Sequence, residues 1–131
     1  MWRMIAGIVA GLCGWAVVAT VLNFGLRTAI PGYVAAEPIL SFTLTMKIAR
    51  LTEAAIASIV AGALVHAIAP ASRWAPWIAG GITLCLFLPV HVQIWSKLPV
   101  WYHLTFLLTI VPLFVLGASI GSASGREPRT A

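Results

Sequence analysis

The chain has 131 residues, of which 61% are hydrophobic and only 8% are charged, and its mean hydropathy is +1.02. A soluble domain carries about 25% charged residues, so this chain lacks the polar surface that a protein needs in water. The net charge of +5 comes from eight basic residues scattered mostly near the ends of apolar runs. That pattern is typical of membrane-flanking anchors and argues against nucleic acid as a partner. We therefore expect a lipid bilayer to surround most of the chain.

Four apolar runs divide the chain, and they cover residues 4–26, 44–69, 74–95 and 101–120. Each is close to the ~20 residues that a helix needs to cross about 30 Å of hydrocarbon. Uninterrupted apolarity, rather than alternation of apolar and polar residues, favours helices over barrel strands. The sequence therefore predicts an all-α polytopic membrane protein, an antiparallel bundle of four transmembrane helices in a single domain, 1–131.

The connections between these runs are unequal. Residues 27–40 contain two prolines and a glycine, and we expect them to lie along the membrane interface. The small residues at 34–36 lie too far beyond the first run for signal-peptide cleavage, so we expect the first helix to be retained. The links at 70–73 and 96–100 are short, which makes consecutive helices antiparallel neighbours. The polar residues 122–131 are predicted to form a flexible tail.

The basic residues set the expected orientation. Four arginines fall on the side of the two termini, and three basic residues, or four with Arg50, fall on the other. Basic residues favour the cytoplasmic side, so we predict an inner (plasma) membrane protein of bacterial type with both termini in the cytoplasm. The residues counted are Arg3, Arg73, Arg126 and Arg129 against Arg27, Lys47 and Lys97.

Small residues four positions apart are expected to form the helix contacts. In lipid, apolar burial does not drive helices together, and small side chains let backbones approach closely. We expect these contacts to lie mainly within the chain, and homodimerisation is the alternative. The residues are Gly7, Gly11, Ala54, Ser58, Gly62, Gly117 and Gly121.

Polar residues inside the apolar runs form the candidate functional site. Glu53 follows Arg50 by three positions, so the two share a helix face. His91 precedes Lys97 by six residues and His103 follows it by six, so an antiparallel hairpin places the histidines at a similar depth. An ionisable group below the interface costs about 2.5–3.5 kcal/mol and should be paired. The candidate site consists of Asn23, Arg50, Glu53, His91 and His103.

Each feature of this cluster has a structural alternative. Arg50 and Glu53 can neutralise each other as a simple ion pair while the arginine extends to the headgroups. The two histidines can bond water or lipid at the interface. Binding of haem or a metal is the other option, but neighbouring helices leave little room for haem. We therefore predict no cofactor and no metal.

No catalytic constellation is visible in the sequence. The chain contains no aspartate and no GxSxG motif, and Cys13 and Cys85 stand alone in apolar runs without a CxxC pattern. We therefore expect the protein not to be an enzyme.

Several short stretches resemble the sequences of short, uncharacterised four-span bacterial integral membrane proteins. They are Leu88-Pro89-Val90-His91, Ile94-Trp95 and Lys97-Leu98-Pro99-Val100-Trp101-Tyr102-His103, with Pro31-Gly32-Tyr33 and Arg50-Leu51 upstream. The resemblance covers most of the chain and implies only the four-span fold and a membrane location. Size and span number are also similar to those of the small multidrug resistance transporters, whose key glutamate lies in the first helix. The first run here has no acidic residue.

Three functions are consistent with the sequence. The first is a non-enzymatic protein that acts through helix packing, as a homo-oligomer or as a subunit of a larger membrane complex. The second is a small oligomeric transporter or proton-coupled carrier that uses Glu53 and Arg50. The third is a haem- or metal-carrying subunit of a redox complex.

Overall fold

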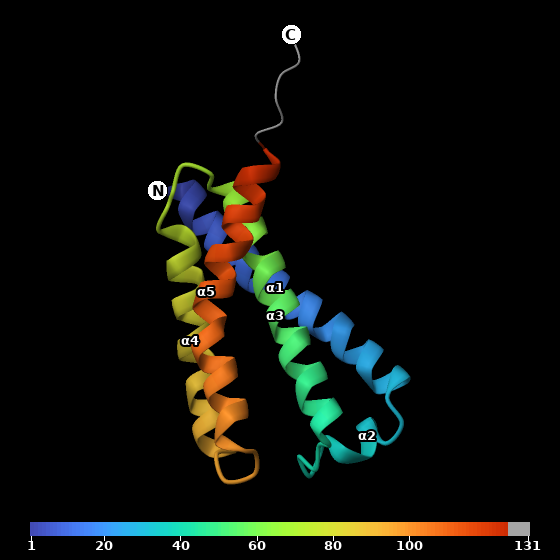
Figure 1. The fold of residues 1–131 in the computed structure, drawn as a ribbon. Coiled ribbons are helices and arrows are strands. Elements are labelled where there is room, and N and C mark those ends of the chain that lie inside the picture. The colour runs from blue at the N-terminus through green and yellow to red at the C-terminus, as the bar shows by residue number, and fades with distance from the viewer. Residues whose placement is uncertain (126–131) are drawn as a thin grey trace.

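The computed structural model describes residues 1–125, and this part of the chain folds into helices without strands. Four long helices are each long and apolar enough to cross a membrane, and they pack together (Figure 1). The prediction of an all-α, multi-pass membrane protein is confirmed. The elements are α1 (Trp2–Ala29), α2 (Tyr33–Ala36), α3 (Leu44–Ile68), α4 (Ala75–Gln93) and α5 (Val100–Ser124).

The long helices occupy the four predicted runs with shifted ends. α1 begins two residues earlier than predicted and continues three residues further, to Ala29. α5 continues to Ser124, and the backbone N–H of Gly125 still bonds to the carbonyl of Gly121. The predicted flexible tail is therefore wrong for residues 122–124, because small polar residues there continue the helical hydrogen bonds. The remainder of that predicted tail, residues 126–131, lies outside the described residues.

The one-turn helix α2 was not predicted, and it folds the connection between α1 and α3 back onto the bundle. Gly32 precedes it with φ of 80°, a backbone conformation that suits glycine. The next residue, Tyr33, is fully buried. It belongs to a small apolar cluster at this end of the protein, formed by Tyr33, Ala36, Phe42, Met46, Leu98 and Tyr102.

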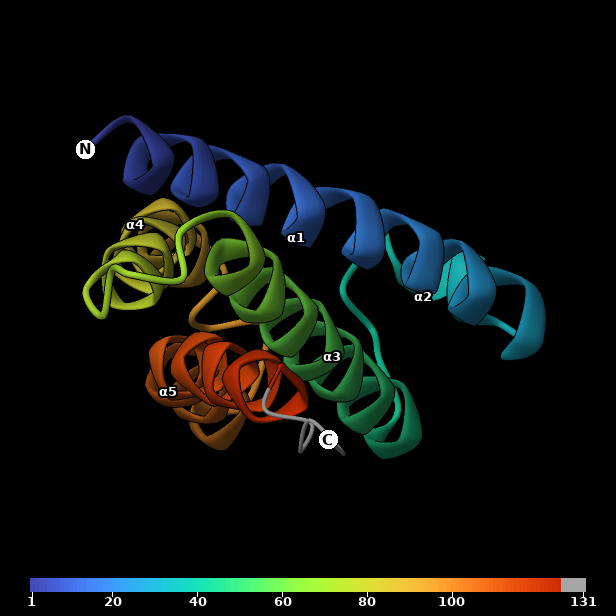
Figure 2. The same ribbon diagram turned by 90° about the horizontal axis from the view of Figure 1, so that it is seen from above.

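The two ends of the bundle are distinct, and the helices alternate between them (Figure 1). The N-terminus, the link 69–74 and the end of α5 lie at what we call the terminal end. α2 and the turn 94–99 lie at the other, the α2 end. α3 is the central helix, packing against α1, α4 and α5 (Figure 2), whereas α1 diverges from α4 toward the α2 end (Figure 1).

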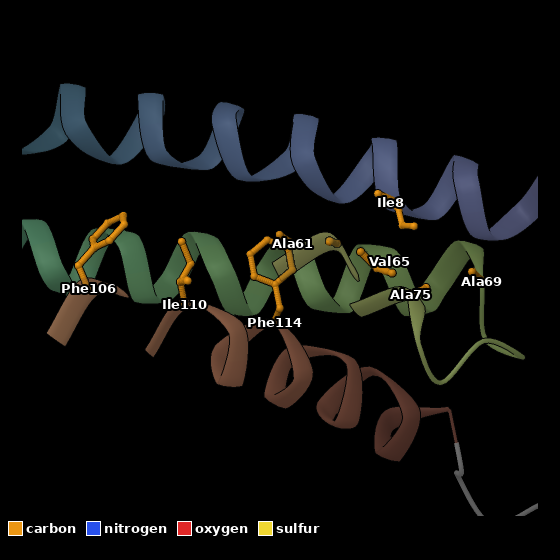
Figure 3. Close-up of a cluster of buried hydrophobic side chains, with 9 residues drawn as sticks. Ile8, Ala61, Val65, Ala69, Ala75, Phe106, Ile110 and Phe114 are labelled. Carbon is orange, nitrogen blue, oxygen red and sulfur yellow. The ribbon is translucent and has the colours of Figure 1, made fainter. Parts of the chain in front are cut away.

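The main core lies in the half of the bundle near the terminal end (Figure 3). Small alanines of α3 and α4 pack around larger side chains, of which Val65 and Phe114 are fully buried. Large apolar side chains cover the outside, and Val17, Leu86 and Leu108 are each more than 60% exposed. Such a surface suits hydrocarbon rather than water. The core comprises Ile8, Ala61, Val65, Ala69, Ala75, Ala79, Phe106, Ile110 and Phe114.

The closest helix contact joins α3 and α5 at Gly62 and Gly117. A Cβ atom added to Gly62 would overlap the backbone of Phe114, and one added to Gly117 would overlap the backbone of Ile59. Two glycines therefore face the opposite backbones where the helices cross, as close approach in lipid requires.

The remaining small residues divide between helix contacts and cavity walls. Gly7 and Gly11 of α1 lie against α3, where added Cβ atoms would meet Ala69 and Val65. A Cβ on Gly121 would make only ordinary contacts. Ala54 packs against the main core and Ser58 bonds Trp15 of α1, and both also line cavities between the helices.

Candidate functional site

A polar cavity of about 420 Å³ lies between the helices in the half of the bundle near the α2 end. All four long helices contribute to its walls, and Glu37 contributes from the end of α2. Three predicted site residues, Asn23, Arg50 and Glu53, line it. The complete lining is Trp15, Ala16, Ala19, Thr20, Asn23, Glu37, Arg50, Glu53, Ala54, Phe87, Tyr102 and Phe106.

Arg50 is held by both tyrosines of the chain. Its Nη1 donates to the hydroxyl of Tyr33 at 2.7 Å, and its Nε donates to the hydroxyl of Tyr102 at 3.2 Å. The guanidinium carbon also lies 4.8 Å from the centre of the Phe42 ring, a cation–π arrangement. These contacts fix the guanidinium beside the cavity but provide no negative charge.

Tyr33 connects three elements through its hydroxyl. It accepts the hydrogen bond from Arg50 of α3 and donates one, at 3.0 Å, to Oδ1 of Asn23 in α1. Burial raises the pKa of Tyr33, and the hydrogen bond and charge of Arg50 oppose that rise. The phenol therefore keeps its proton at neutral pH and can serve as donor and acceptor at once.

Glu53 lines the cavity, and one of its carboxyl oxygens is unpartnered within residues 1–125. Its Oε2 is buried and has no hydrogen-bond partner among the described residues. Within the described residues, Glu53 does not form the predicted ion pair with Arg50. The ion pair that is present joins Arg27 and Glu37, with Nε of Arg27 2.9 Å from Oε1 of Glu37. Residues three apart share a helix face, but Arg50 reaches the tyrosines instead of the carboxylate.

Aromatic side chains line the side of the cavity that faces the middle of the bundle, which we call its deep side. Trp15 Nε1 donates to Oγ of Ser58 at 3.0 Å, and that hydroxyl donates to the carbonyl of Ala54 at 2.7 Å. The ring of Trp15 lies 4.8 Å from that of Phe87, which in turn lies 5.1 Å from Phe106. Polar groups therefore line the part of the cavity near the α2 end, and aromatic rings line the part toward the middle of the bundle.

The two histidines form a separate buried pair. Their Nδ1 atoms are 2.8 Å apart, and Nε2 of His103 lies 3.2 Å from the carbonyl oxygen of Trp95. A carbonyl oxygen only accepts, so Nε2 of His103 carries a proton in this contact. In a neutral pair, His103 Nδ1 then accepts from Nδ1–H of His91.

This pair gives both Nδ1 atoms, and Nε2 of His103, a partner within the protein. Neither histidine lines the polar cavity, although both are buried. Within residues 1–125, no three His, Cys, Asp or Glu side chains are grouped to hold a metal ion. The five predicted site residues are thus divided between a cavity set (Asn23, Arg50 and Glu53) and a histidine pair.

Sequence reasoning missed the side chains that organise the cavity. Tyr102 was not predicted as a site residue, but it is only 4% exposed and binds Arg50. Tyr33 and Trp15 were not predicted as site residues. A usable signal was present: the chain has only two tyrosines, and a charged side chain within a membrane needs hydrogen-bonding partners.

No family model, curated protein or solved structure matches this chain. A function must therefore be argued from the cavity and its residues.

Proposed function

We propose that the protein is a non-enzymatic membrane carrier that binds a small polar or amphiphilic molecule in the cavity near the α2 end. The observation that carries this proposal is the buried Oε2 of Glu53, which has no partner among the described residues at the wall of a 420 Å³ cavity. A buried carboxyl oxygen without a partner is costly. A ligand that donates a hydrogen bond to it would remove that cost.

The glycine contacts favour this role over that of a helix-packing subunit. Four of the predicted packing glycines contact other helices of the same chain, so they are not available to pack against a partner protein. They are Gly7, Gly11, Gly62 and Gly117. The exposed side chains of the long helices are mainly apolar, as contact with lipid requires. We therefore place the function in the cavity.

We also propose that this cavity opens to the side opposite the cytoplasm in a bacterial inner membrane. The basic residues favour cytoplasmic termini, and the α2 end lies opposite the N-terminus (Figure 1).

The experiment asks whether water and solutes reach the cavity from the α2 end. Ala19 lines the cavity and precedes the end of α1 by ten residues, or about 15 Å of helix. We would introduce Ala19→Cys into a chain with Cys13→Ala and Cys85→Ala, because both native cysteines are free and exposed. A membrane-impermeant thiosulfonate reagent would then be added to right-side-out and inside-out vesicles.

We expect the Ala19→Cys thiol to react in right-side-out vesicles and not in inside-out ones. The matched control is Val17→Cys on the same helix, since Val17 is 62% exposed and does not line the cavity. In hydrocarbon its thiol does not ionise and should not react. Absence of reaction at Ala19→Cys in both vesicle types would contradict the carrier proposal, and reaction only in inside-out vesicles would reverse the orientation.

A further inference from the structure

The distribution of polar groups along the cavity indicates what kind of molecule fits it. Arg50 and Glu53 lie in the half of α3 near the α2 end, whereas Trp15 lies in the middle of α1 and bonds Ser58 deeper in the bundle. Ser58, which binds Trp15, follows Arg50 by eight residues, or about 12 Å of helix. A bound molecule would therefore meet polar groups at membrane-interface depth and apolar ones deeper in, the polarity gradient of an amphiphile.

The charges near the α2 end indicate the head group. Arg50 uses Nε and one N–H of Nη1 on the two tyrosines, and no acidic partner neutralises it among the described residues. Its remaining N–H groups suit a phosphate or carboxylate, which guanidinium binds well. Glu53 Oε2 lacks a hydrogen-bond donor, and an N–H-bearing ammonium would supply one. A purely anionic head could donate at most hydroxyl hydrogen bonds to Glu53 and would leave its charge unneutralised, and a purely cationic head would leave that of Arg50 unneutralised.

The divergence of α1 gives such a molecule a route from the bilayer. α1 packs on α3 and also contacts α4, where Trp15 meets Phe87, but it diverges from α4 toward the α2 end (Figure 1). A cavity of 420 Å³ holds a head group and the start of a chain. The rest of an acyl chain would lie in the hydrocarbon beside α1.

We propose that the cavity binds an amphiphile whose head group carries both an N–H-bearing ammonium and a phosphate, with Glu53 binding the ammonium and Arg50 the phosphate. This inference rests on the proposed carrier function and specifies its ligand. Quaternary ammonium heads are disfavoured because they have no N–H for Glu53, although they keep the phosphate for Arg50.

The experiment measures which lipid stays bound. The full chain would be placed in nanodiscs with equal amounts of phosphatidylethanolamine, phosphatidylcholine and phosphatidylglycerol, and released into the gas phase for native mass spectrometry. We expect phosphatidylethanolamine to be retained at least fivefold over each of the others. Glu53→Gln should bring that preference over phosphatidylcholine close to one, and Arg50→Lys should lower the total lipid retained.

Lys97→Gln is the matched control, because Lys97 is an exposed cation at the same end that does not line the cavity. It should change neither the preference for phosphatidylethanolamine nor the total lipid retained. Equal retention of phosphatidylcholine and phosphatidylethanolamine, or preference for phosphatidylglycerol, would overturn the zwitterion inference while leaving a binding cavity. Complete displacement of the lipid by soluble phosphoethanolamine at millimolar concentration would overturn the amphiphile and favour a free solute. No retained lipid and no bound phosphoethanolamine would overturn the inference, whereas the carrier proposal is decided by the Ala19→Cys labelling.

Discussion

The two halves of this bundle differ in how closely their helices pack. Near the terminal end, glycines and alanines bring α3 into direct contact with α1 and α5. Near the α2 end the helices separate, and polar side chains from α1, α2, α3 and α5 surround a cavity. Close packing fixes the first half, and a few hydrogen bonds centred on Arg50 fix the second. In the proposed carrier, the ligand would bind at the end that is less closely packed.

The strongest test of the packed half is Gly62→Ala. The added Cβ would overlap the backbone of Phe114, and backbones yield less than side chains, so we expect a loss of about 3 kcal/mol or more. Thermal unfolding in detergent measures it. Gly81→Ala is the control, since nothing lies within 4 Å of its added Cβ, and alanine favours a helix by up to about 1 kcal/mol. Equal stability of the two variants would contradict the close α3–α5 contact.

The open half is tested by Tyr33→Phe. The change removes the hydrogen bonds to Arg50 and Asn23, and bonds to charged groups contribute about 1.5–3 kcal/mol. We expect a loss of about 2–3 kcal/mol in the same unfolding measurement. Tyr102→Phe should cost less, because that hydroxyl makes one longer bond to Arg50. The reverse order would show that Tyr33 does not hold this end together.

Tyr33 should also make the stability of the protein depend on pH. Burial raises the pKa of Tyr33 above its ordinary value of 10.0, so folding favours the protonated phenol. This stabilisation is complete below the unfolded-state pKa and is lost as the pH rises through the raised folded-state value. We expect wild-type stability to fall more steeply above about pH 10 than that of Tyr33→Phe. Parallel pH profiles of the two proteins would contradict this effect.

Removal of the hydrogen bond at the deep side of the cavity should have a smaller effect. Trp15→Phe keeps an aromatic ring beside Phe87 but removes the bond to Ser58. A neutral hydrogen bond contributes about 1 kcal/mol, and we expect a loss of that size in thermal unfolding. Ser58→Ala should give a similar loss, and the double variant should lose less than the sum of the two. Strict additivity would show that the pair does not interact.

Glu53→Gln should alter stability least. Glu53 Oε2 has no hydrogen-bond partner among the described residues, so the substitution removes no observed contact of that atom, and we expect a change within about 0.5 kcal/mol. Unfolding in lipid-free detergent measures it. A loss as large as that of Tyr33→Phe would reveal an interaction of the carboxylate that the proposed role excludes.

The sequence predicted the packed half better than the open one. Long apolar runs define spanning helices because the backbone must satisfy itself in hydrocarbon, and glycine spacing marked Gly62 and Gly117 for close contact. The depth count from Lys97 likewise predicted that His91 and His103 lie at one level, and their rings are in contact. These inferences depend on chain length and residue size alone.

The open half depends on the directions of individual side chains, which spacing does not specify. Arg50 and Glu53 share a helix face, yet the arginine reaches Tyr33, more than a dozen residues earlier in the chain. That contact exists only because Gly32 turns the connection and α2 folds Tyr33 into the bundle. A helix of four residues leaves no periodic signal in the sequence, so its consequences for the site could not be predicted.

The crossing of α3 and α5 at Gly62 also has a mechanical consequence. Gly62 lies twelve residues from Arg50, so a rigid α3 would form a lever about 18 Å long between them. A rotation of only about 5° at the crossing would move the backbone of Arg50 by roughly 1.5 Å. The position of Arg50 is therefore more sensitive to the crossing angle of α3 and α5 than the packing around Gly62 is.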